Sequence, residues 1–218
     1  MRSAQVIIIG VACYSLIVGV IFGGYIHSEL INSEICYGCM GLQPKTPLFQ
    51  IFWVEYPSGH IREGLPVPHS DWIRAVLKEK VVFIFLWQTG CKPCDVQWIE
   101  MKSAGIVKGE ERNGEISDEY KESIALFSLD VGTNQSEYDA MKIYNPYGKN
   151  FGTPTTIVLT LIYNNTLNKV EIGWFSFIGP TGGAGGQPTV AQLKNILDVA
   201  VFYHHKNRAQ WNDLDKAS

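Results

Sequence analysis

An uninterrupted apolar run that leads into two cysteines constrains this chain more than any other feature. The run Val81–Leu86 is followed by Trp87-Gln88-Thr89-Gly90 and then by Cys91-Lys92-Pro93-Cys94. Such a run predicts a strand covered on both faces. The cysteines then stand in a short turn at the expected start of a helix, where the positive helix end stabilises a thiolate. Because the thiolate is the form that attacks disulfides, the pattern predicts a pair able to exchange disulfides with other proteins.

The elements expected around this strand alternate between strands and helices. The sequence predicts strands over 48–56, 81–87, 124–131, 155–163 and 169–177 and helices from Ser70 or Asp71, from Cys94 to about Ala104, over 137–144 and over 190–204. The charged, glycine-bearing segment 105–120 is interpreted as a solvated insertion. This order predicts an α/β sandwich, in which the last two strands form a hairpin.

The N-terminal segment predicts a membrane anchor. Residues 6–26 contain no charged side chain, and a helix of this length spans about 31 Å, close to one bilayer core. Arg2 precedes the run, whereas Glu29 and Glu34 follow it, so the N-terminus is expected in the cytoplasm and the rest outside. We therefore expect an uncleaved signal anchor at 1–28, a connector at 29–47, a folded domain at 48–206 and a tail at 207–218. The alternative for the first segment is a cleaved signal peptide, whose apolar core is usually shorter.

Cysteine usage and charge narrow the function classes further. The chain has five cysteines in 218 residues, two C-x-x-C pairs and Cys13 alone, which is too few for a dense disulfide framework. The net charge of −3 offers no basic patch for nucleic acid. Redox chemistry is therefore favoured over nucleic-acid binding. Metal is not expected at Cys91 and Cys94, and no cofactor is expected.

The second pair, Cys36 and Cys39, has three interpretations. It can be a structural disulfide in the connector, a redox pair that trades electrons with the first pair, or a source of metal ligands. Met40 stands where a c-type haem site needs histidine, which excludes that site. A zinc site made only of cysteines would need both pairs.

Several features from Ser70 to His204 occur together in one order. Trp87 stands four residues before Cys91, proline precedes Cys94, and Asp130 ends the next predicted strand. Thr153-Pro154 stands directly before the predicted hairpin. In this combination the chain resembles the thioredoxin family. The resemblance implies a three-layer α/β/α sandwich with a mixed central sheet, here preceded by one transmembrane helix.

The resemblance also implies roles for individual residues. Cys91 would be the attacking thiol and Cys94 the resolving one, with Lys92 and Pro93 tuning the thiolate. Pro154 would be a cis-proline that exposes the backbone of Thr153 to a substrate strand, and Trp87 would border the same substrate site. Partners would be cysteine-containing exported proteins and a membrane or soluble redox partner. The alternative is a non-catalytic binding or assembly module of the same fold, whose disulfide is structural.

Two positions depart from the family pattern. Phe85 stands where cytoplasmic thioredoxins have a buried aspartate, and Gly90 replaces the tryptophan often found before the first cysteine. These departures argue against a general cytoplasmic reductase. The motif does not separate an oxidase from an isomerase or a reductase.

Overall fold

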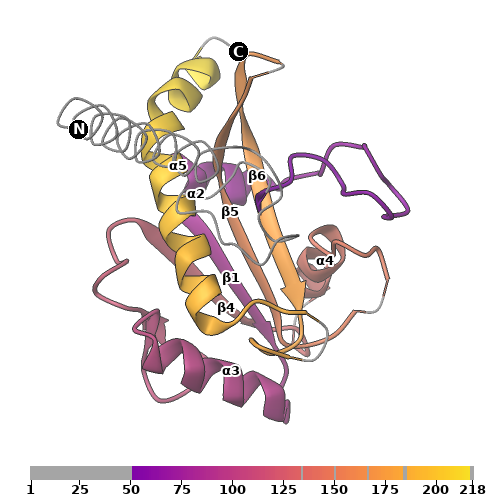
Figure 1. Cartoon of the computed structure of the whole chain (residues 1–218), viewed down its shortest axis with the longest axis vertical. Coiled ribbons are helices and arrows are strands. Elements are labelled where there is room, and N and C mark those ends of the chain that lie inside the picture. The colour runs from indigo at the N-terminus through magenta and orange to yellow at the C-terminus, as the bar shows by residue number, and fades with distance from the viewer. Residues whose placement is uncertain (1–50, 134, 150, 166, 184–185, 217–218) are drawn as a thin grey trace, which may run out of the picture. The chain divides into compact units, whose positions relative to one another are not determined.

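A four-stranded mixed sheet organises the part of the chain that the structure describes (Figure 1). This computed structural model describes residues 51–133, 135–149, 151–165, 167–183 and 186–216. The sheet has the order β4-β1-β5-β6 and consists of β1 (Val81–Trp87), β4 (Ile124–Asp130), β5 (Thr155–Asn164) and β6 (Lys169–Ile178). Strand β1 is parallel to β4 and antiparallel to β5, and β5 forms a hairpin with β6. The prediction of a mixed α/β fold is confirmed.

Helices pack against both faces of the sheet because the central strand is apolar on both sides. In β1, Val81, Phe83 and Phe85 pack on one face, with α3 (Lys92–Ser103) and α5 (Val190–Lys216). The alternate residues Val82, Ile84 and Leu86 pack on the other face, with α2 (Asp71–Leu77) and with residues in and just after α4 (Gln135–Ile143). All six of these strand side chains are fully buried. The uninterrupted apolar run therefore produces two separate cores, one on each side of the sheet.

The strand expected at 48–56 is not present in its described part. Trp53 exchanges two backbone hydrogen bonds of 2.8 Å with Trp174 on β6, but this is an isolated bridge. The chain then turns back on itself, since the N–H of Tyr56 donates to Leu65 and the N–H of Gly64 donates to Tyr56. Strand-forming side chains in this segment therefore pack without extending the sheet.

The segment 105–120 is more ordered than the solvated insertion that its composition predicts. It forms a small hairpin of β2 (Val107–Lys108) and β3 (Glu115–Ile116). Ile106 and Val107 are buried at its base. Its tip carries the charged residues that gave the segment its polar appearance.

The last helix is longer than expected. Helix α5 continues past His204 to Lys216 and so crosses the domain boundary placed at residue 206. Buried polar contacts hold this extension: His204 Nε2 lies 2.8 Å from the carbonyl of Leu77, and Asn207 Nδ2 donates to the carbonyl of Leu161 at 2.8 Å. His204 is therefore a packed side chain inside the helix, which was predicted to end at this residue.

The expected membrane anchor and connector lie outside the described residues, as do Cys13, Cys36 and Cys39. Within the described ranges, none of the helices combines the length and the apolar character that a bilayer span requires.

Candidate functional site

Cys91 and Cys94 form a disulfide at the start of α3. Their sulfur atoms are 2.02 Å apart. Cys91 is the N-cap residue of the helix, and its Sγ accepts a hydrogen bond of 3.2 Å from the N–H of Cys94. Cys91 is partly exposed, whereas Cys94 is completely buried. An attacking sulfur can thus reach Cys91 but not Cys94, and the helix end offers N–H groups to a thiolate at Cys91.

The Thr153–Pro154 peptide bond lies at the same end of the sheet. Thr155, the first residue of β5, pairs with Leu86 near the end of β1, and Cys91 follows β1 after a short turn. The bond between Thr153 and Pro154 is cis, as the sequence predicted. Pro154 is buried, and its carbonyl accepts a hydrogen bond of 2.8 Å from the N–H of Gly179.

The remaining residues predicted for the site differ in exposure. Lys92 and Pro93 are exposed on the first turn of α3, and Thr153 is half-buried. Trp87 is also half-buried, and its Nε1 donates to Ser128 Oγ on β4 at 3.0 Å. The indole of Trp87 is therefore held against the neighbouring strand.

Arg112, at the tip of the β2–β3 hairpin, lies at the site although the sequence did not indicate it. Its guanidinium lies 4.5 Å from the centre of the Trp87 ring and donates to the carbonyl of Gln88 at 3.1 Å. Its Nε lies 3.2 Å from Asp95 Oδ1 in the first turn of α3. Gly109 and Gly114 flank Arg112 and were the available signal for a tight hairpin.

A buried polar pair lies behind the disulfide. Gln97 is on the buried face of α3 together with Cys94, and its Nε2 donates to Thr156 Oγ1 on β5 at 2.6 Å. Both side chains are fully buried, and Gln97 Oε1 has no hydrogen-bond partner among the described residues. Thr156 pairs with Phe85, the position where the resemblance led us to look for an acid. This part of the site therefore contains an amide and a hydroxyl beside the apolar Phe85.

The loop between β1 and α3 is anchored to the end of β4. Thr89 Oγ1 donates to Asp130 Oδ2 at 2.8 Å, and the other carboxylate oxygen of Asp130 accepts from the N–H of Gly132 at 2.9 Å. Asp130, singled out in the sequence as the end of a strand, thus holds the turn that carries Cys91.

No family model matches the chain, and no curated protein matches its sequence. The geometry of the site therefore carries the functional argument. Within the described ranges, no group of three or more His, Cys, Asp or Glu side chains is arranged to hold a metal ion.

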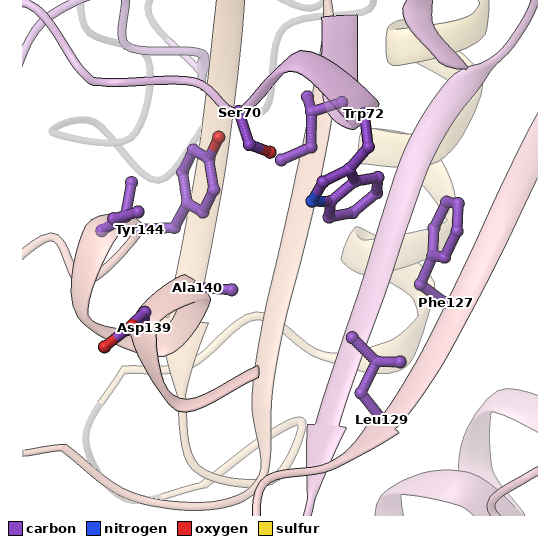
Figure 2. Close-up of a pocket in the computed structure, with 9 residues that line it drawn as sticks. Ser70, Trp72, Phe127, Leu129, Asp139, Ala140 and Tyr144 are labelled. Atoms are coloured by element: carbon purple, nitrogen blue, oxygen red, sulfur yellow. The ribbon is translucent and has the colours of Figure 1, made fainter. Parts of the chain in front are cut away.

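A separate hollow lies on the other face of the sheet, beside α2 and α4 (Figure 2). It has a volume of about 480 Å³, and Trp72, Phe127 and Leu129 form one side of it. The rings of Trp72 and Phe127 are 4.8 Å apart. Its lining is mainly apolar and includes neither cysteine nor histidine, in contrast to the site around Cys91.

Proposed function

We propose that this chain is a thiol–disulfide oxidoreductase with a thioredoxin-like fold. One observation carries the proposal: a C-x-x-C disulfide caps a helix with one cysteine partly exposed and the other completely buried. This asymmetry gives the two cysteines different roles. A structural disulfide needs neither an accessible sulfur nor a thiolate-stabilising helix end.

The reaction is written for a client protein with two thiols. A client thiolate attacks Cys91 Sγ, the Cys91–Cys94 bond breaks, and Cys94 leaves as a thiolate that takes a proton from solvent. The second client thiolate then attacks the client sulfur of this mixed disulfide and releases Cys91. Two electrons pass from the client to Cys91 and Cys94, and the reverse sequence reduces a client disulfide. The reduction potential of the pair sets the direction.

The backbone of Thr153 supports the binding of an extended client segment. Among the described residues no backbone partner pairs with Thr153, because the ladders of β5 with β1 and β6 begin at Thr155. A client strand beside the cysteines can form hydrogen bonds with the backbone of Thr153 by strand addition. The apolar run at 6–26 is the reason to propose that the clients are exported proteins and that an anchor holds the domain outside the cytoplasm.

Trapping on a Cys94→Ser variant tests this function. Without Cys94 the mixed disulfide at Cys91 cannot be resolved from within the protein, so clients should accumulate as covalent complexes in cells. Cys91→Ser is the matched control and should trap none. Clients that carry export signals are expected, and clients confined to the cytoplasm would contradict the proposed location.

The reduction potential of the full chain separates the enzyme from a structural module. We expect a reduction potential between about −120 and −270 mV, measured by equilibration with glutathione, which is the range of known exchange proteins. A value below about −300 mV, together with no trapped client, would indicate a structural disulfide and end the proposal.

A further inference from the structure

We propose that Arg112 is a positioning residue that raises the thiolate fraction of Cys91 by neutralising Asp95 and fixing the turn around the cysteines. This inference rests on the proposed thiol–disulfide exchange and adds a control element from outside the C-x-x-C motif. It concerns the reduced protein, in which Cys91 is free.

The guanidinium of Arg112 bridges the two sides of the cysteine turn. On one side it donates to the carbonyl of Gln88, which also accepts the N–H of Cys91 at 3.1 Å. On the other side it pairs with Asp95, whose N–H donates to the carbonyl of Cys91 at 3.3 Å. Arg112 thus contacts two of the three residues whose backbones bond to that of Cys91, the third being Cys94.

Asp95 carries the negative charge that Arg112 offsets. It stands in the first turn of α3, so its carboxylate opposes a second negative charge at the Cys91 sulfur. Arg112 offsets that charge through the 3.2 Å ion pair. Other charged groups near the turn are Lys92 on the same turn, Asp130 at the end of β4, and Glu110 and Glu111 at the hairpin tip. None of them changes in the variants proposed below.

The position of Arg112 is fixed by the fold of the hairpin tip. Its side chain is only 21% exposed, and its ring contact with Trp87 is 4.5 Å. Its backbone carbonyl accepts the hydroxyl of Ser128, and this same hydroxyl oxygen accepts Trp87 Nε1. These contacts already restrict the side chain of Arg112. Pairing with Asp95 therefore costs less side-chain entropy than it does in a fully exposed ion pair, and the charge is held in place.

Solvent still reaches the pair. The side chain of Asp95 is 53% exposed, and a hollow of about 440 Å³ lies beside it, lined in part by Ile99 and Glu111. Water therefore screens the interaction, and we expect a moderate effect on Cys91.

The test is the pH profile of Cys91 alkylation in the reduced full chain, with iodoacetamide as the probe and peptide mapping to isolate Cys91. In Arg112→Gln the midpoint should rise by about half a unit to one unit, because Asp95 loses its counter-charge. In Asp95→Asn the midpoint should fall by a similar amount, about half a unit. Arg112→Lys keeps the charge and should lie between wild type and Arg112→Gln.

The double variant Arg112→Gln with Asp95→Asn decides the mechanism. Its midpoint should return to within about 0.3 units of wild type, because both opposing charges are gone. A midpoint unchanged in Arg112→Gln, or a shift that Asp95→Asn does not reverse, overturns the inference. If Arg112→Gln does not fold, an unshifted midpoint in Asp95→Asn overturns it equally. The alkylation profile is measured without a client protein. A failure of this inference can therefore be distinguished from a failure of client trapping.

Discussion

Gln97 and Thr156 show how single buried side chains shape the region behind the disulfide. Their hydrogen bond of 2.6 Å joins α3 to β5 where both residues are fully buried. Because Gln97 Oε1 has no partner among the described atoms, part of this amide already carries a desolvation cost. The pair therefore contributes through its mutual bond, and removing one partner leaves the other unsatisfied.

A double-mutant cycle tests this pair. Gln97→Met leaves the Thr156 hydroxyl without its donor and should lower the free energy of unfolding by about 1–2 kcal/mol. Thr156→Val leaves the whole amide of Gln97 unsatisfied and should cost about 1–3 kcal/mol. Urea unfolding, monitored by tryptophan fluorescence, measures the free energy of unfolding of both variants.

The combination of the two substitutions is the informative measurement. It should be less destabilised than the sum of the single variants by about 1 kcal/mol or more, because no buried polar group is then left unpaired. Strictly additive effects would show that the two side chains do not depend on each other.

At the scale of elements, the local sequence pattern predicted the strands and helices whose structure depends mainly on their own residues. The run 81–87 is apolar at every position, so its burial on both faces follows from composition alone. The start of α3 follows from cysteine and proline at its first positions. The hairpin of β5 and β6 follows from the turn residues between two runs rich in strand formers.

Contacts between distant segments could not be predicted in this way. Arg112 lies in a charged stretch, and only the folded hairpin brings it to Trp87. His204 is near the end of the predicted helix, but the carbonyl of Leu77 gives it a buried partner. The segment around Trp53 has strand-like composition, but its described residues pair with β6 at one position only. In each case the decisive partner is far away in sequence.

Gly114 is the element-scale test of how the hairpin is held. A Cβ at this position would lie 2.2 Å from the carbonyl oxygen of Lys108 and 2.7 Å from Cζ2 of Trp98. The first neighbour is backbone of β2 and the second lies on α3, so Gly114→Ala must distort the hairpin and disturb its contact with α3. We expect a loss of about 2 kcal/mol or more in the free energy of unfolding, measured by urea titration.

Gly152→Ala is the matched control for Gly114→Ala. Among the described atoms, the added Cβ would meet Ile178 Cγ2 alone, at an ordinary 3.6 Å. Its effect should stay within about 0.5 kcal/mol of wild type. Equal stability of the two variants would mean that the hairpin is not packed on α3 as described.

At the scale of the whole molecule, three partly or fully buried histidines link folding to pH. The pKa of His60, His69 and His204 is lowered in each case, with burial as the largest cause. Burial lowers the pKa of His69 to about 4, with a further contribution from the positive charge of Arg74. The unfolded chain therefore binds more protons than the folded protein at mildly acidic pH, so stability falls as the pH falls.

His69 offers the clearest measurement of this linkage. It shares a hydrogen bond of 2.9 Å with the Tyr144 hydroxyl through Nδ1. In the unfolded chain its ring takes a proton below about pH 6.5, whereas the folded protein resists protonation until about pH 4. Between these values His69 should account for a loss of about 2–3 kcal/mol in the free energy of unfolding.

His69→Asn keeps a polar group near the Nδ1 position without titrating, so the stability of this variant should fall less than that of wild type over this range. Urea titrations from pH 7.5 to 4 compare this variant with wild type. Parallel curves for His69→Asn and wild type would show that His69 is protonated equally in both states.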